Sequence, residues 1–305
     1  MEAVLLNLLG GQSTNPQIAR PPISLAALDD RVRHLQMNAI EISTAKTYAT
    51  GARDYIRFCL LFNLPLTPTP VTLSRYIAYA SSAIASAPKY LSGARHFLKD
   101  IYPEFDENRS HPLVQTTIRG SKKIRTDSIR RKQPLRLAHL QAFLDIARLS
   151  QTYDDFLFAT LLSVCFYGCH RSGELVWKND KAQWDWRKVI KRASLIISDH
   201  RVQYHLPYHK ADPFYHGTDI LLSHHEIADP VTLMHEYVIK HDRYHGARPA
   251  LFICADGSVP TRSWFDNKIF TVLSRDFGGQ SPRAGAATYY ASLGLPESII
   301  QAIGR

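Results

Sequence analysis

Hydrophobic residues repeat with a helical period along most of this chain, and one stretch interrupts that period. This stretch contains three short runs that are rich in β-branched residues or alternate apolar with polar residues, at 193–198, 202–208 and 218–222. The pattern predicts three short strands. Helical patterns precede this stretch and return after it. Strands gathered in one place, rather than alternating with helices, argue against a doubly wound nucleotide-binding fold. The sequence therefore predicts a mainly α fold with a small antiparallel β-sheet.

The chain is long enough, at 305 residues, for two domains that each bury a core. Gly10-Gly11, Asn15-Pro16 and Pro21-Pro22 break helices near the N-terminus. We expect a loose N-terminal arm at 1–24, an all-helical domain at 25–118, a basic linker at 119–134 and a second domain at 135–305. Helices of the first domain are expected near 43–62, 72–84, 88–101 and 111–120. Helices of the second are expected near 135–149, 156–168, 230–243, 261–277, 283–293 and from 296 onward.

Positive charge is concentrated at the expected domain boundary. The formal net charge is +10, and residues 119–136 contain eight basic side chains against the single acid Asp127. These basic residues are Arg119, Lys122, Lys123, Arg125, Arg130, Arg131, Lys132 and Arg136. The segment could be a solvated linker, a strap on a phosphate backbone or a nuclear-import signal. We favour contact with nucleic acid because the segment coincides with the boundary between the domains.

Composition limits the class of protein. The apolar fraction of 45% and the charged fraction of 21% are typical of a globular protein. The four cysteines are scattered, which suits a reducing compartment better than a disulfide framework. The N-terminus lacks the basic flank of a secretory signal, and no apolar run approaches the length of a membrane span. We expect an intracellular protein, in the nucleus if the cell has one, neither secreted nor in a membrane.

Three short motifs place cationic side chains where they could hold a phosphate. The first, Tyr167-Gly-Cys-His-Arg-Ser-Gly-Glu-Leu, delivers Arg171 at the end of an apolar helix, with Glu174 three residues on to orient it. The second, His209-Lys-Ala-Asp, places Lys210 between two predicted strands. The third, Gln280-Ser-Pro-Arg-Ala-Gly, places Arg283 at the start of a helix. A surface ion pair and a solvated turn lysine are the ordinary interpretations of the first two motifs.

In this order, the motifs resemble the catalytic domain of the tyrosine site-specific DNA recombinases, the phage-integrase family. The resemblance covers residues 135–305, and more loosely 43–102, which is similar to the family's helical core-binding (SAM-like) domain. It implies a two-domain DNA-breaking–rejoining architecture that clamps duplex DNA. It also implies that Arg171 and Arg283 bind the scissile phosphate and that Lys210 protonates the leaving 5′ oxygen. Planar guanidinium groups suit this role because each can contact two phosphate oxygens.

The chain departs from the family pattern at three positions. Gln280 stands where the family usually has histidine, so a hydrogen-bond donor replaces a group that exchanges protons near neutral pH. Arg305 stands at a position usually occupied by histidine or tryptophan, which adds a third cation. The nucleophilic tyrosine is expected beyond Arg305, so the chain is expected to stop before it. Tyr289 and Tyr290 are poor substitutes because the family packs that helix into its core.

Other candidate sites are weaker. Cys165 and Cys169 with His170 lack the second cysteine pair of a zinc finger, so core packing is the expected role of these cysteines. His205, His209, His216, His224 and His225 are scattered over predicted strands and loops, as solvated or capping histidines are. No nucleotide-binding fingerprint occurs. We expect no metal and no small-molecule cofactor.

Three functional hypotheses remain open at this point. The favoured one is a DNA-binding protein, acting in or derived from DNA integration and site-specific recombination of the kind found in mobile elements, that holds phosphate without an in-chain nucleophile. The second is an active recombinase that takes its tyrosine from a longer product or from another protomer. The third is a protein-interaction scaffold that no longer binds DNA. Double-stranded DNA is the expected partner, and self-association on the DNA stays open.

Overall fold

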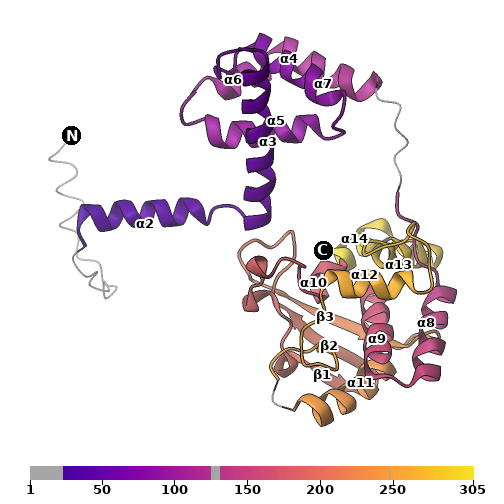
Figure 1. Cartoon of the computed structure of the whole chain (residues 1–305). Helices are drawn as coiled ribbons and strands as arrows, with labels where there is room; N and C mark the ends of the chain where they lie inside the picture. Colours follow the sequence, from indigo (N-terminus) through magenta and orange to yellow (C-terminus); the bar gives the residue numbers. More distant parts are fainter. Residues whose placement is uncertain (1–22, 125–130, 247) are drawn as a thin grey trace. The chain divides into compact units, whose positions relative to one another are not determined.

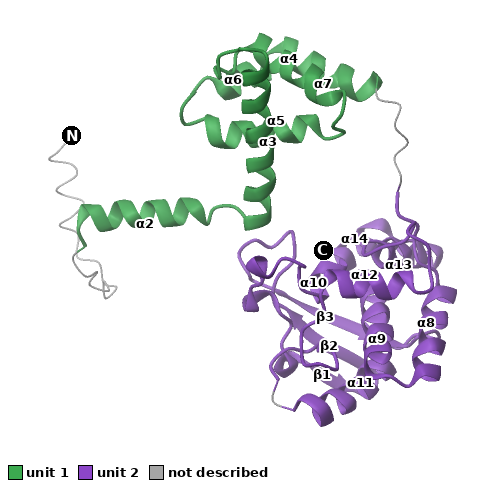
Figure 2. Ribbon diagram, in the orientation of Figure 1, with its two compact units in different colours: residues 1–126 green, residues 127–305 purple. Residues whose placement is uncertain are grey.

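A computed structural model describes residues 23–124, 131–246 and 248–305. The chain divides into two compact units, residues 1–126 and 127–305 (Figures 1 and 2). Residues 1–22 of the expected N-terminal arm, together with Arg125 and Arg130 of the basic segment, lie outside the described residues. Among those that are described, every helix is too short or too polar to cross a lipid bilayer.

Among residues 23–124, the regular elements of unit 1 are all helices (Figure 1). Their bounds are α2 Leu25–Met37, α3 Ile42–Leu61, α4 Pro70–Ser81, α5 Ala87–Leu98, α6 Phe105–Ser110 and α7 Pro112–Ile124. Thr69 caps α4 by accepting the backbone N–H of Thr72, and Pro70 suits the first helical turn because its missing donor is not needed there. The core contains Tyr55, Tyr76 and Leu91, each fully buried. Helix α2 buries no residue.

Helices α3 and α5 approach each other through two glycines. Gly51 of α3 lies against the backbone of Tyr90, and Gly93 of α5 lies against the backbone of Tyr48. A Cβ atom at either glycine would overlap the carbonyl oxygen of the facing residue. The close contact between these helices therefore depends on two positions that have no side chain.

Gly51→Val should lower the free energy of unfolding of unit 1 by about 3 kcal/mol, because the added methyl groups force α3 and α5 apart. The matched control is Gly120→Ala on α7, where a Cβ meets nothing within 4 Å. That change should raise stability slightly, by about 0.5–1 kcal/mol, because alanine favours the helix. Urea denaturation followed by circular dichroism measures both. Equal stabilities for Gly51→Val and the wild type would contradict the close contact.

Unit 2 contains helices, short 3₁₀ turns and one sheet. The helices are α8 Leu137–Ser150, α9 Tyr153–Tyr167, α10 Ser172–Leu175, α11 Pro230–His245, α12 Arg262–Phe270, α13 Ser281–Ser292 and α14 Glu297–Gly304. The 3₁₀ turns are η1 Lys181–Gln183, η2 Trp186–Lys188 and η3 Arg192–Ser194. The strands β1 Ile196–Ser198, β2 Arg201–Leu206 and β3 Thr218–Ser223 form an antiparallel sheet in the order β1-β2-β3.

Helix α9 forms the centre of the unit 2 core. Residues from Phe156 to Tyr167 are all buried, and α8, α11 and α13 pack around the helix. Strand β2 alternates buried and more exposed residues, so that Val202, Tyr204 and Leu206 face the core. The structure confirms the predicted mainly α fold with a small antiparallel sheet and an all-helical N-terminal unit.

Helix α7 extends into the segment that the sequence analysis assigned to a linker. It ends at Ile124, so Arg119, Lys122 and Lys123 lie on its last two turns. The physical reason is that lysine and arginine are good helix formers, while Val114 and Ile118 fix the helix to the core. Helix α6 was not predicted, and the helix expected near 261–277 ends at Phe270.

Candidate nucleic-acid interface

The chain reverses sharply between α9 and α10 and presents Arg171 at the turn. Helix α9 ends at Tyr167 with Gly168 as its C-cap, Cys169 adopts a positive φ of 48°, and Arg171 is the N-cap residue of α10. A Cβ at Gly168 would overlap the ring of His170, so the turn requires a glycine there. The side chain of Arg171 is 28% exposed. Its guanidinium is thus carried by a rigid support and remains accessible.

A buried carboxylate holds this arginine. Glu174 Oε1 accepts from Arg171 NH1 at 3.0 Å, and Glu174 Oε2 accepts from the backbone N–H of Arg171 at 3.2 Å. His170 Nδ1 lies 3.0 Å and Arg305 NH2 lies 3.3 Å from the same Oε2. Burial raises the pKa of Glu174, but the donors, with His170 foremost, outweigh it and lower the pKa to about 2. The carboxylate is therefore ionised and orients its cationic neighbours.

His170 connects the carboxylate to the sheet. Its ring is fully buried, its Nε2 lies 2.6 Å from the hydroxyl of Tyr204 on β2, and its Nδ1 faces Glu174. The ionised Glu174 carboxylate favours a proton on Nδ1, and Nε2 then accepts from the Tyr204 hydroxyl. Burial is the main reason why the pKa of His170 falls to about 4. Sequence reasoning weighed His170 only as a zinc ligand and missed Tyr204. The signal available was a histidine directly before the arginine of the motif.

Arg283 approaches the same turn from α13. Its NH1 donates to the backbone carbonyl of Cys169 at 2.6 Å. Cys169 lies two residues before Arg171, and burial followed by the charge of Arg171 lowers the pKa of Arg283. On the other side of Arg283, the backbone of Gly304 lies so close that a Cβ there would come within 2.9 Å of its NH2. The structure thus brings together the two predicted arginines.

Arg305 is a third arginine at this turn, and it is more buried than Arg171. Its side chain is 8% exposed, and its NH2 donates to the carbonyl of Gly168 at 3.2 Å besides contacting Glu174. Its Nε is buried, and no described residue forms a hydrogen bond with it. Arg171, Arg283, Arg305, Glu174 and His170 are called the arginine cluster below.

Lys210 lies on a separate turn at the end of the β2–β3 hairpin. The turn is closed by the backbone hydrogen bond from Asp212 to His209, at 2.9 Å, and the Asp212 carboxylate accepts the backbone N–H of Gly217 at 2.7 Å. Gly217 has a φ of 73° and lies against the ring of His205, so only glycine fits. Lys210 itself is exposed. A rigid loop therefore carries this cation, which the structure does not bring into contact with the arginine cluster.

Gln280 lies at the N-cap of α13, three residues before Arg283 and on the same side of the helix. Its side chain is exposed and makes no capping hydrogen bond. The amide can therefore donate to a ligand that contacts Arg283.

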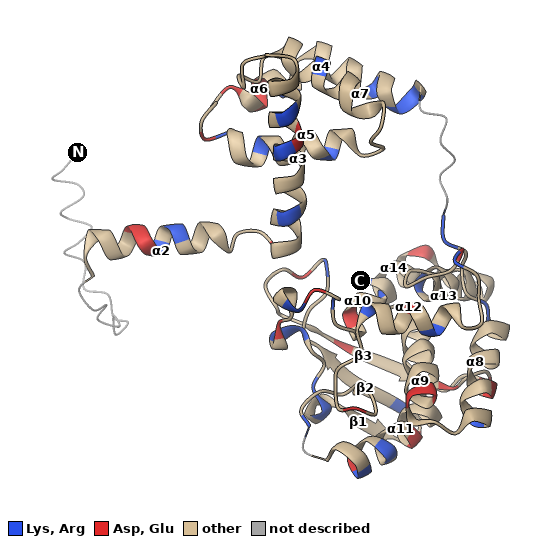
Figure 3. Ribbon diagram, in the orientation of Figure 1, with Lys and Arg blue, Asp and Glu red and all other residues tan. Residues whose placement is uncertain are grey.

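The described residues of the basic segment lie on two supports. Arg119, Lys122 and Lys123 are exposed near the end of α7, where Figure 3 shows lysine and arginine positions. In unit 2, the Lys132 ammonium donates to the carbonyl of Arg275, and Leu135 N–H donates to the carbonyl of Ser281 at 3.0 Å. Two exposed arginines belong to this anchored segment, Arg131 and Arg136, and Arg136 is the N-cap of α8.

The two tyrosines of α13 are engaged in the core. The Tyr290 hydroxyl is buried and donates to the carbonyl of Tyr167 at 2.7 Å, and burial raises its pKa well above the ordinary range. Tyr289 packs against the rings of Phe166 and Tyr167. The Tyr290 phenol is thus not available for attack on a phosphate, and the Tyr289 hydroxyl lies 3.5 Å from His225 Nδ1.

The cysteines and histidines that were weighed as weaker candidate sites make ordinary structural contacts. Cys165 Sγ contacts the carbonyl of His170 inside the core, and His205 and His224 pair with Asp219 and Asp229 respectively. Across the described parts of the chain, no group of three His, Cys, Asp or Glu side chains is arranged to hold a metal ion.

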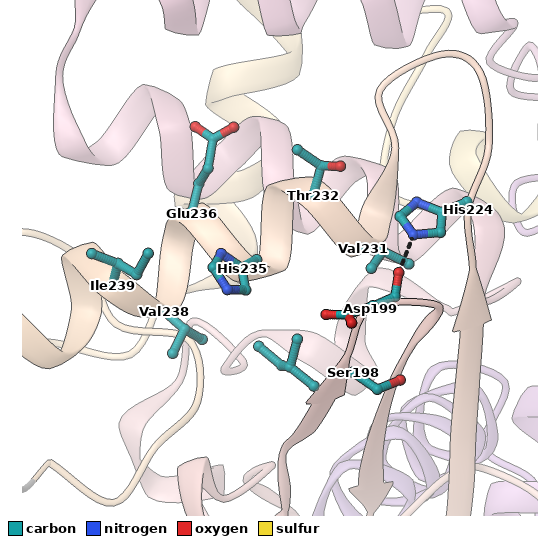
Figure 4. Close-up of a pocket in the computed structure, with 10 residues that line it drawn as sticks. Ser198, Asp199, His224, Val231, Thr232, His235, Glu236, Val238 and Ile239 are labelled. Atoms are coloured by element: carbon teal, nitrogen blue, oxygen red, sulfur yellow. Dashed lines mark hydrogen bonds between the residues drawn. The ribbon is translucent and has the colours of Figure 1, made fainter.

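A pocket of about 410 Å³ lies between α11 and the turn that joins β1 to β2. Figure 4 shows His235, Val238 and Ile239 of α11 facing Ser198 and Asp199, with His224 Nε2 hydrogen-bonded to the Asp199 carbonyl at 2.8 Å. No residue of the arginine cluster lines it. Its mixed apolar and polar lining gives no indication of a ligand.

Comparison with known proteins places this geometry in context. No protein-family model and no curated protein matches the chain. Solved structures are similar. The Tn1549 transposon integrase in complex with transposon right end DNA matches with a TM-score of 0.52 at 14% identity, over 90% of this chain and 89% of the integrase. The chain has the tyrosine-recombinase fold.

Two further structures share this fold. A lambda integrase dimer bound to a COC′ core site matches with a TM-score of 0.50 at 13% identity, over 92% of this chain and 94% of that one. The XerH site-specific recombinase bound to its difH substrate, in a pre-cleavage complex, matches with a TM-score of 0.50 at 14% identity over 77% of this chain. This chain spans 62% of the XerH chain.

The buried His170 and Glu174 side chains predict that the stability of unit 2 falls at acidic pH. His170 has a pKa of about 4 in the folded chain against about 6.5 when unfolded, so the unfolded state binds the extra proton between these values. Its stabilising effect is complete above about pH 6.5 and is lost as the pH falls toward 4. Glu174, with a pKa of about 2, extends the loss below about pH 4.5.

We expect the wild type to lose on the order of a few kcal/mol between pH 7 and pH 4 through His170. Urea denaturation at several pH values measures the slope. His170→Gln should flatten it, whereas His200→Gln, at an exposed histidine, should leave it unchanged. Identical slopes for the wild type and His170→Gln would show that this histidine is not buried as a neutral group.

Proposed function

We propose that this chain is a DNA-binding protein of the integrase kind, acting in or derived from DNA integration and site-specific recombination. It holds a backbone phosphate with Arg171 and Arg283. The observation that carries the proposal is the arginine cluster, in which one ionised carboxylate and two backbone carbonyls orient three guanidinium groups, from α13 and from the ends of α10 and α14. Oriented, partly desolvated guanidinium groups bind phosphate more strongly than flexible surface cations do. The DNA named with each similar structure supports the same class of partner.

The other predicted residues take supporting roles in this proposal. Lys210 reaches the same phosphodiester from the hairpin loop, and Gln280 donates a hydrogen bond to it. The described basic residues on α7 and before α8 neutralise neighbouring phosphates and release their counterions. Glu174 orients Arg171, and the Cys169 carbonyl orients Arg283. Arg305 is a further donor to Glu174. Self-association on the DNA belongs to the proposal as well, since lambda integrase was solved as a dimer on its site.

Salt dependence of duplex binding tests the proposal. A protein that contacts six to ten phosphates loses roughly 10³- to 10⁵-fold in affinity between about 50 and 200 mM salt. We expect this behaviour in a fluorescence-anisotropy titration of a labelled duplex. Neutralising Lys122, Lys123 and Arg131 together should make the slope of log K against log salt shallower by about 3.

Two results would contradict the proposal. An affinity that does not change with salt would exclude a phosphate-backbone interaction. A chain that binds no duplex, but retains a protein partner after the same neutralisation, would favour an interaction scaffold.

A further inference from the structure

The segment between α10 and β1 is basic and is built from 3₁₀ turns. Residues 178–192 contain six lysines and arginines against two aspartates. The basic residues are Lys178, Lys181, Arg187, Lys188, Lys191 and Arg192, and the acids are Asp180 and Asp185. Figure 3 shows lysine and arginine positions on the loops beside α10. The roles proposed so far for the arginine cluster and the basic segment leave these side chains without a function.

Tryptophan stacking fixes one side of this segment directly after α10. Trp177 is buried, its backbone N–H donates to the carbonyl of Pro260 at 2.8 Å, and its carbonyl accepts from Arg262 N–H at 2.8 Å. The ring of Trp184 stacks on Trp177 at 5.1 Å and 12°, and Trp186 meets Trp177 edge-on at 5.5 Å. The segment is therefore anchored six residues after Arg171.

The other side of the segment is fixed to the loop that carries Lys210. Lys188 Nζ lies over the ring of Tyr208 at 4.2 Å, and the Arg187 guanidinium lies over the ring of Tyr215 at 4.7 Å. The Tyr215 hydroxyl also donates to Asp185 at 3.2 Å. Tyr208 and Tyr215 flank the Lys210 turn and pack against each other at 5.1 Å. A continuous, ordered surface thus runs from α10 to the Lys210 turn.

Aromatic rings orient two lysines of this surface, Lys181 and Lys191, without cancelling their charge. Lys181 Nζ lies over Trp184 at 5.7 Å, and Lys191 Nζ lies over Trp186 at 5.1 Å while donating to the Trp186 carbonyl at 2.7 Å. An ion pair would neutralise each ammonium, whereas a ring orients it and leaves the positive field intact. Trp184 and Trp186 are 36% and 54% exposed, so the surface faces solvent.

We propose that residues 177–191 and the loop 207–217 form a second DNA-contact surface, which binds the duplex backbone beside the phosphate held by Arg171 and Arg283. Its charge is complementary to a polyanion, and its continuity with α10 and with the Lys210 turn places it next to the proposed site. Ordered lysines contact phosphates at a smaller entropic cost than flexible ones do. This inference rests on the proposed function. It adds the surface along which the duplex lies next to the arginine cluster.

The test is the double variant Lys181→Gln/Lys191→Gln. We expect duplex affinity at low salt to fall roughly tenfold and the slope of log K against log salt to become shallower by about 2. The matched control, Arg201→Gln/Arg243→Gln, removes two exposed charges of the same unit and should leave the slope near that of the wild type. Lys181→Arg/Lys191→Arg should restore binding because it restores the cations. Circular dichroism and thermal melting establish that each variant is folded.

The outcomes distinguish the two proposals. A shallower slope for the lysine variant alone, with rescue by arginine, supports this surface. Equal slopes for the lysine variant and the wild type would overturn it while leaving the proposed function intact. Equal losses in the lysine variant and in the control would also overturn it, because binding would then depend only on net charge. A wild type that shows no salt-dependent duplex binding would overturn the proposed function itself.

Discussion

Glu174→Ala is expected to lower the free energy of unfolding of unit 2 by about 3–5 kcal/mol, because it leaves buried partners without their counter-charge. Glu174 is 5% exposed and faces Arg171, Arg305 and His170. Removing the carboxylate leaves the Arg305 guanidinium, 8% exposed, next to a void. Chemical denaturation followed by tryptophan fluorescence measures the loss, since all four tryptophans belong to unit 2.

Glu174→Gln should cost less than Glu174→Ala, because the amide keeps the volume and one acceptor while losing the charge. Glu297→Ala on α14 serves as the control. That side chain is exposed, and such changes usually stay within about 0.5 kcal/mol. A Glu174→Ala variant as stable as the Glu297→Ala control would contradict the role of this carboxylate as the common acceptor of the cluster.

Arg171→Gln/Arg283→Gln is expected to weaken duplex binding on the order of 100-fold at low salt. The reason is that charge-assisted hydrogen bonds are worth roughly 1.5–3 kcal/mol each, and about 1.4 kcal/mol corresponds to a factor of ten. Fluorescence anisotropy with a labelled duplex measures the change. The control is again Arg201→Gln/Arg243→Gln, which removes the same number of charges from exposed positions of unit 2.

Lysine variants separate charge from geometry. Arg171→Lys/Arg283→Lys keeps both charges but loses the planar forks, so we expect an affinity between those of the wild type and the glutamine variant. Thermal melting confirms that each protein is folded. Full affinity in the glutamine variant would show that DNA binds elsewhere. Equal losses in the glutamine variant and in the control would show that the two arginines contribute only through the net charge of the protein.

Regular elements could be predicted from the sequence because their residues repeat with the period of the structure. The apolar run of α9 and the alternation of Val202, Tyr204 and Leu206 in β2 are examples. Helix ends were less predictable. Lysines and arginines near the end of α7 are compatible with either a helix or a linker. The helix forms there because Ile118 packs into the core of unit 1.

Contacts among the candidate residues could be predicted where the residues lie close together in one motif, and could not be predicted where the fold brings distant segments together. The pairing of Arg171 with Glu174 follows from their spacing on one helix. The contact of His170 with Tyr204 joins residues 34 positions apart, and no local pattern announces it. The 3₁₀ turns at 181–194 also escaped prediction, since turns of three residues are too short to show a period.

A structure of this chain with duplex DNA tests the central claim most directly. We predict that the guanidinium groups of Arg171 and Arg283 both lie about 2.7–3.2 Å from oxygens of one and the same phosphate, with the Lys210 ammonium directed at that phosphodiester. DNA bound over a different face of the unit, with both arginines contacting only protein, would contradict the account.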